Sequence, residues 1–164
     1  MAVSTIDGTL VEAEPGRQAA GIRVFRKLVF RLDSGEEQIV SKALTNSKLA
    51  ERLQPGAKGR FYLFKAIDHR GVHGVRLVDG EPLHAFPKNN ERISLILLIV
   101  MVAWIAGALI LVGGLPIFAT IMVLFGVPYY VLIVNMRGEA RRQFEGDAAY
   151  RPRAIDPASG APPG

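Results

Sequence analysis

The sequence predicts a membrane α+β protein, in which a small all-β domain with one short helix is followed by a two-helix transmembrane hairpin. Two observations support this fold class. Residues 93–134 contain no Asp, Glu, Lys, Arg or His, although 21% of the whole chain is charged. Residues 1–88 instead alternate apolar and polar side chains over short runs, which is typical of half-buried strands. We therefore divide the chain after residue 88.

The all-β domain is expected to contain five or six strands, each assigned from its local pattern. Strands are predicted over residues 5–12, 21–32, 37–44, 59–67, 72–77 and 81–86. A short helix over residues 48–54 follows a cap at Asn46 or Ser47 and ends at Pro55-Gly56. The predicted order is three strands, a helix and two or three further strands.

This order of elements resembles that of small Greek-key barrels of the OB type, and the resemblance covers residues 1–86. The resemblance implies a surface across the second and third strands that binds oligomers. A small barrel attached to a membrane hairpin is also similar to the NfeD-like proteins, in which the spans come first and the barrel last. This second resemblance implies an architecture and no activity.

Two uncharged runs, residues 93–112 and 115–134, form the predicted spans, separated by Gly113-Gly114. Each is long enough, because twenty helical residues rise about 30 Å, the thickness of the hydrocarbon core. Pro116 fits the first turn of the second helix, and Pro128 is expected to kink it. A buried pair of core helices is disfavoured, since so small a soluble domain cannot cover that many uncharged residues.

Basic and aromatic residues flank the spans on one side only, and the turn between the spans is uncharged. The positive-inside rule therefore predicts a multi-pass protein of the plasma or inner membrane with both termini in the cytoplasm. The first thirty residues lack the apolar run of a secretory signal, so the β domain is expected to stay where it is made. The predicted interface residues are Lys88, Arg92, Tyr129, Tyr130, Arg137, Arg141 and Arg142.

The last segment, residues 135–164, is predicted to be a basic juxtamembrane helix followed by a disordered tail. The arginines of residues 137–150 are expected to meet anionic headgroups, and the tail is rich in proline. Within the first span, Ala103 and Gly107 form a small-xxx-small pair that lets another helix approach, from the second span or from a partner. The expected partners are the lipid bilayer and another membrane protein or a second copy of the chain.

Arg23, Phe25, Lys27 and Arg31 are predicted to share one face of the second strand. A basic face with an aromatic side chain is typical of proteins that bind single-stranded nucleic acid. The alternative is an ordinary solvated face, because carboxylates are interspersed among the basic residues. Phe25 alternatively covers a second small core.

The sequence predicts neither a cofactor nor a metal, and it does not predict an enzyme. The chain contains no cysteine, which excludes disulfides, thiolate metal sites and a thiol nucleophile. His69 and His73 are four residues apart, but Gly71 between them predicts a turn, so they do not form the one-face pair that zinc binding on a helix needs. Neither a phosphate-binding loop nor a nucleophile elbow occurs.

Three functions remain, in order of preference. The first is a non-enzymatic module, in which the hairpin holds a cytoplasmic β domain at the membrane and that domain binds a partner protein or helps to assemble a membrane complex. The second is a membrane-tethered protein that binds nucleic acid or another anionic polymer. The third is an oligomeric transport component, which is disfavoured because the spans lack the ionisable residues that ion and proton pathways use.

Overall fold

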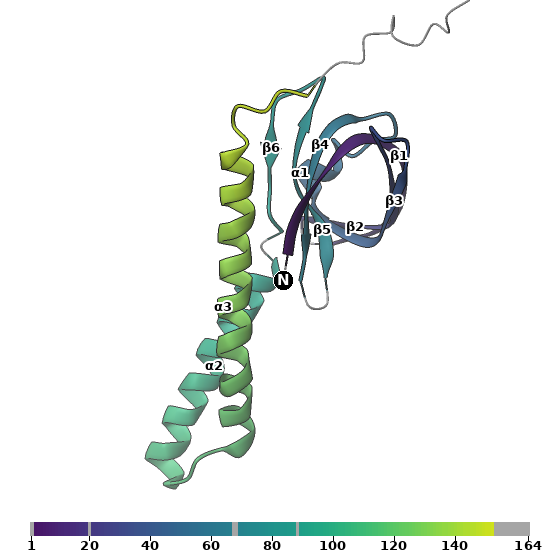
Figure 1. Ribbon diagram of the computed structural model, residues 1–164. Coiled ribbons are helices and arrows are strands. Elements are labelled where there is room, and N and C mark those ends of the chain that lie inside the picture. The colour runs from purple at the N-terminus through teal and green to yellow at the C-terminus, as the bar shows by residue number, and fades with distance from the viewer. Residues whose placement is uncertain (1, 20, 67–68, 88, 153–164) are drawn as a thin grey trace, which may run out of the picture.

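A β-barrel and a pair of long helices make up the structure. The computed structural model describes residues 2–19, 21–66, 69–87 and 89–152, and the side chains of all of these except 89–91. The barrel is N-terminal and the helices are C-terminal (Figure 1). The predicted interface residue Lys88 and the predicted disordered tail beyond residue 152 lie outside the described residues.

Five strands close into the barrel. β1 pairs with β2 and with β4, β2 pairs with β3, and β4 pairs with β5, all antiparallel. A parallel pairing of β3 with β5 completes the ring, and β6 extends the sheet beside β5. At this closure Gly71 is needed, because a Cβ there would collide with the Leu44 carbonyl group. The strands are β1 (Ala2–Ala19), β2 (Ile22–Leu32), β3 (Glu37–Asn46), β4 (Lys58–Lys65), β5 (Arg70–Leu77) and β6 (Leu83–His84).

The barrel encloses an apolar core. The rings of Phe30 and Phe61 meet in it with centroids 4.8 Å apart. The short helix α1 (Ser47–Ala50) adds Leu49 to this core, and its cap is Asn46, whose Oδ1 accepts a hydrogen bond from the Lys48 N–H at 3.0 Å. The helix is shorter than the predicted 48–54, because the chain leaves it at residue 51 through turns.

Two strand boundaries also differ from the prediction. β1 is much longer than residues 5–12, because it continues alongside β2 as a hairpin that reaches the pair Ala19 and Ile22. The last strand, predicted over residues 81–86, is reduced to β6, which pairs with β5 through two residues. The remaining strands are found near their predicted places.

An irregularity at Arg26 reverses the side-chain alternation of β2. Arg26 has no partner on β1, whereas its neighbours Phe25 and Lys27 do. Because the extra residue shifts the alternation, Phe25 and Leu28 both contribute to the barrel core, and Phe25 is only 3% exposed. The prediction of one basic and aromatic face on β2 is therefore wrong, since its aromatic member belongs to the core.

The C-terminal helices α2 (Asn89–Val112) and α3 (Ile117–Gly146) pack against each other and project well beyond the barrel (Figure 1). Pro116 precedes α3, and its carbonyl oxygen accepts a hydrogen bond from the Thr120 N–H at 3.0 Å. α3 is assigned as one helix through Pro128 and past residue 135. The second predicted span and the predicted juxtamembrane helix are thus a single element.

Both helices are long and apolar enough to cross a membrane. Within the most apolar stretch of each candidate span, none of α2 and 11% of α3 is buried in the protein. Large apolar side chains near the turn are mostly exposed, for example Ile110 at 81% and Leu111 at 85%. This exposure distinguishes the pair from the core helices of a soluble domain, which bury such side chains.

The small residue at the contact between α2 and α3 is not one of the two that the sequence predicts. A Cβ on Gly107 would meet no atom within 4 Å, so the predicted pair Ala103 and Gly107 does not bring α2 against α3. A Cβ on Gly126 of α3 would instead lie 3.3 Å from Leu98 Cδ1. The Ala103–Gly107 pair is left available to another helix.

Candidate functional site at the barrel–helix junction

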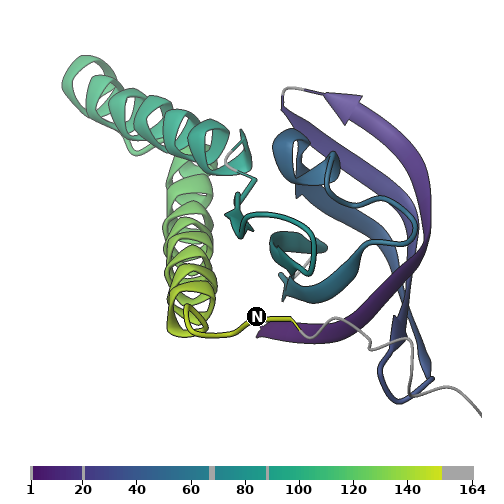
Figure 2. The same cartoon turned by 90° about the horizontal axis from the view of Figure 1, so that it is seen from above.

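The C-terminal half of α3 packs along the outside of the barrel, as the view from above shows (Figure 2). Phe64 of β4 and Phe86, which follows β6, form a second apolar cluster with Met136 and Ala140 of α3. The two phenylalanine rings lie 4.9 Å apart. We call this contact between α3 and strands β4 to β6 the junction.

Aromatic and histidine rings continue the junction toward the end of α3. Phe144 of α3 has its ring centroid 5.0 Å from Tyr62 and 5.2 Å from His84. Gly74 of β5 makes room for it, since a Cβ there would lie 2.8 Å from Phe144 Cδ2. Phe144 of α3 therefore packs against the barrel at a position of β5 that has no side chain.

A polar cluster fixes the chain after α3 to the barrel, and we call it the latch. Arg60 of β4 donates hydrogen bonds to both carboxylate oxygens of Asp7 at 2.7 Å and to Asp147 at 3.0 Å. Its guanidinium carbon also lies 3.6 Å from the ring centroid of Tyr150. The hydrogen bonds from Arg60 hold the pKa of Asp7 below its usual value.

Two further side chains of the barrel bond to the end of α3. The hydroxyl of Tyr62 donates to Asp147 at 3.0 Å, and burial together with this carboxylate raises the pKa of Tyr62 to about 12. Arg76 donates to the carbonyl oxygen of Phe144 at 2.9 Å. A cation at this position is favourable, because the last carbonyls of a helix carry partial negative charge.

His73 lies under α3 and is fully buried. Among the described residues, neither of its ring nitrogens has a hydrogen-bond partner, and the same holds for Gln143 Oε1. Burial lowers the pKa of His73 to about 4, and the nearby His84, 5.4 Å away between ring centroids, lowers it further. The imidazole is therefore neutral at neutral pH.

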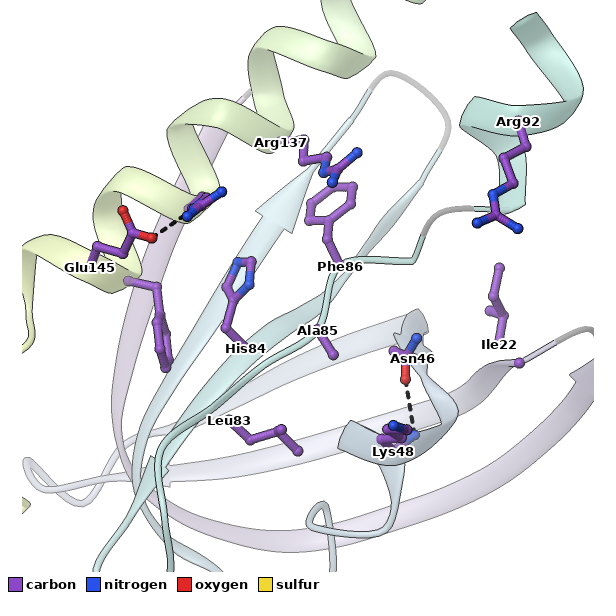
Figure 3. Close-up of a pocket in the computed structure, with 13 residues that line it drawn as sticks. Ile22, Asn46, Lys48, Leu83, His84, Ala85, Phe86, Arg92, Arg137 and Glu145 are labelled. Atoms are coloured by element: carbon purple, nitrogen blue, oxygen red, sulfur yellow. Dashed lines mark hydrogen bonds and ion pairs between the residues drawn. The ribbon is translucent and has the colours of Figure 1, made fainter.

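A crevice of about 830 Å³ opens beside the junction, between one end of the barrel and the two helices. Figure 3 shows Asn46 and Lys48 on the barrel side, His84 and Phe86 along the wall, and Arg92 and Arg137 on the two helices. We call it the basic crevice. Within the described part of the chain, its charged lining consists of Lys48, Arg92, Arg137, Arg141 and Glu145.

Positive charge prevails in the basic crevice. Arg141 Nε donates to Glu145 at 2.7 Å, one helical turn away. The side chains of Lys48 and Arg92 have no ion-pair partner within the described part of the chain. Burial lowers the pKa of His84 at the edge of the crevice, and Arg141 lowers it further.

The structure gathers some of the predicted interface residues and separates others. Arg92, Arg137 and Arg141 come together in the basic crevice, although they belong to two helices. Arg142 is exposed on α3 and does not line it. Tyr129 and Tyr130 are half-buried within α3.

The basic residues of β2 do not form an unbroken positive face. Lys27 Nζ pairs with Glu12 at 2.8 Å, and Arg31 pairs with Glu37 at 3.0 Å. All four side chains are substantially exposed. Each of the two cations thus has a neighbouring carboxylate on the adjacent strand.

No group of three or more His, Asp or Glu side chains suited to hold a metal ion occurs among the residues that the structure describes. The comparisons find no relative. No protein-family model, curated protein or solved structure matches this chain. The assignment of function therefore depends on the junction, the latch and the basic crevice.

The residues of the junction and the latch were missed by sequence reasoning. A signal for the junction exists, because Met136, Ala140 and Phe144 recur every fourth residue and form an apolar stripe on the otherwise polar end of α3. The latch has no local signal. Asp7 and Arg60 meet only because β1 pairs with β4, which brings residues far apart in sequence into register.

Proposed function

We propose that this protein is a non-enzymatic membrane adaptor, in which the α2–α3 hairpin is inserted in the bilayer and presents the barrel to a partner protein. The observation that carries the proposal is the junction. Because α3 continues from the apolar stretch directly onto the barrel wall, the barrel is attached to the hairpin in a fixed orientation. Such an arrangement suits a module whose role is to position a binding surface.

Insertion of the hairpin is supported by the exposed apolar surface of both helices. Soluble monomers rarely expose apolar patches of more than a few hundred Å². Lipid is the natural cover for two adjacent helices of this length, and the uncharged turn between them can cross the bilayer at low cost. With the arginines at the barrel end, the proposed orientation has the barrel and both termini in the cytoplasm.

The barrel is proposed to be of the OB type. The parallel pairing of β3 with β5 and the position of α1 between β3 and β4 support this assignment. Barrels of this type bind their ligands across the second and third strands. Here α3 covers the opposite wall, so β2 and β3 keep an open outer face.

This open face has the chemistry of a protein contact. Ile39 of β3 is 56% exposed, whereas its partner on β2, Val29, is only 4% exposed. The neighbouring cations Lys27 and Arg31 are matched by carboxylates, which reduces the attraction for a polyanion. An apolar centre with a polar rim is typical of protein interfaces. Nucleic-acid binding is accordingly the second candidate.

The test is cross-linking in intact cells followed by mass spectrometry of proteins that co-purify with the full-length chain. We expect a near-stoichiometric partner that survives nuclease treatment and is lost with Ile39→Glu. The matched control is Val11→Glu, which alters another exposed apolar residue, on β1. Recovery that depends on nucleic acid, or equal recovery with both variants, would contradict the proposed contact.

A further inference from the structure

The basic crevice has the composition of a site for a phosphate group. We propose that it binds the phosphate of an anionic phospholipid headgroup, an inference that rests on the proposed membrane insertion. Among the described residues, four cations and one carboxylate form its charged lining. Guanidinium groups bind phosphate oxygens through paired N–H donors, and three of the four cations are arginines.

The residues that line the crevice come from three separate parts of the fold, so the crevice exists only because the junction brings these parts together. Lys48 comes from α1, Arg92 from the start of α2 and Arg137 from the second half of α3 (Figure 3). Arg141 lies one helical turn after Arg137 and also lines the crevice. The docking of α3 on the barrel brings these cations around one space. A local run of basic residues on a single helix would not enclose a ligand in this way.

Its position matches the level of lipid headgroups. Arg92 immediately precedes the uncharged stretch of α2, and Arg137 follows that of α3 within three residues. Both ends therefore lie where the hydrocarbon core gives way to phosphate. A headgroup can enter the crevice from the bilayer without its acyl chains leaving the membrane.

Its size and mixed lining fit a headgroup better than a bare ion. About 830 Å³ is within the ordinary range of ligand pockets, about 300–1,000 Å³, and exceeds what a free phosphate needs. Ile22, Leu83 and Phe86 add apolar surface beside the cations. This surface can contact the glycerol portion of a phospholipid.

Two cations of the crevice are available to an anion. Arg92 and Lys48 lack an ion-pair partner within the described residues, and like charges that face one space repel each other. Burial is the main cause of the lowered pKa of His84 at the edge of the crevice; Arg141 and Arg137 lower it further, and Glu145 opposes them. A bound phosphate would relieve this repulsion.

The experiment is native mass spectrometry of the full-length protein, purified in detergent, delipidated and titrated with phosphatidylglycerol or phosphatidylcholine. We expect preferential binding of phosphatidylglycerol, weakened about fivefold by Arg92→Gln and by Arg141→Gln. Arg92→Gln is the cleaner variant, since Arg141→Gln also leaves Glu145 unpaired. The matched control is Arg142→Gln, which removes the same charge next to Arg141 but outside the crevice.

Equal weakening by Arg142→Gln would overturn the proposal, because it would indicate general attraction to the membrane surface. Equal binding of the two lipids would overturn it as well. Added inorganic phosphate distinguishes the sources: displacement of the lipid assigns the site to soluble phosphate, and no displacement assigns it to the headgroup. Membrane fractionation of the variants tests the proposed insertion independently. A variant that no longer inserts leaves the membrane fraction, whereas a variant that only loses the lipid stays in it.

Discussion

His73 is a buried ionisable group whose position predicts that acid destabilises the folded protein. It has no ladder partner on β4, because Tyr62 pairs with Gly74 and Leu63 with Val72. This bulge directs the imidazole outward from the barrel, where α3 covers it. A neutral ring can remain there, whereas a charged ring would lose its hydration without gaining a counter-ion.

We therefore expect the stability of the folded protein to fall between pH 6.5 and about 4. In the unfolded chain His73 titrates at its ordinary pKa of 6.5, so over this range the unfolded state binds more protons than the folded state. Stability is complete above pH 6.5 and decreases by about 3 kcal/mol as the pH falls to about 4. Urea unfolding in detergent, followed by circular dichroism, measures this change.

The control for this effect is His73→Leu, which removes the titrating group and two unpaired ring nitrogens. In this variant the free energy of unfolding should change much less with pH above pH 4. The remaining change is the smaller contribution of His84, which acts in the same direction. The Asp7 carboxylate acts at lower pH, because its stabilisation is lost only as the pH falls below its ordinary pKa. An unchanged slope in the variant would contradict the assignment to His73.

At the scale of elements, the two halves of α3 have different surroundings. Its first half exposes apolar side chains on nearly every side, and its second half presents a narrow apolar stripe to the barrel. Phe144 of that stripe packs against Gly74 of β5, where an added Cβ would lie 2.8 Å from Phe144 Cδ2. The position of the Phe144 ring therefore depends on residue 74 having no side chain.

This dependence predicts a coupling between Gly74→Ala and Phe144→Ala. In the wild type the added methyl group displaces the Phe144 ring, and we expect a cost of about 1–3 kcal/mol. In the Phe144→Ala background the same change should cost almost nothing, because the space is then open. Hydrogen exchange of residues 137–150 measures the docking, and an equal loss of protection in both backgrounds would contradict this packing.

The elements that sequence could predict are those with a local signal. Alternation and turns located most strands, and unbroken apolar runs located both helices, because these patterns depend only on neighbours in the chain. Phe25 was misplaced because one extra residue, Arg26, reverses the alternation, and periodicity does not reveal which residue a sheet leaves unpaired. The basic crevice could not be predicted, since Lys48 and Arg141 meet only after α3 has docked.

At the scale of the whole molecule, the barrel and the hairpin form one body joined by the junction and the latch. A flexible tether would let the barrel face any direction above the bilayer. The observed contacts instead fix the orientation of the barrel relative to the hairpin. Under the proposed insertion, a partner that binds the open face of β2 and β3 would be held at a defined height and angle above the bilayer.

The proposed orientation predicts which parts of the chain are reached from outside the cell. Because the chain has no cysteine, single cysteines can be placed without background. We expect Gly114→Cys, in the turn between the helices, to react with a membrane-impermeant maleimide in intact cells. Ser34→Cys, exposed on the barrel, should react only after permeabilisation. The opposite pattern would place the barrel on the outer side.

The latch joins Asp7, near the beginning of the sequence, to Asp147 and Tyr150, near its end. A ribosome therefore completes every strand of the barrel before it makes the residues that cover Tyr62, Phe64 and His73. Until α3 has been synthesised, these side chains form an exposed, largely apolar patch on a barrel whose strands are already complete. If the hairpin inserts in the membrane as proposed, α3 completes both the insertion and the covering of that patch. A chain whose hairpin fails to insert would then keep an apolar surface that quality-control factors can recognise.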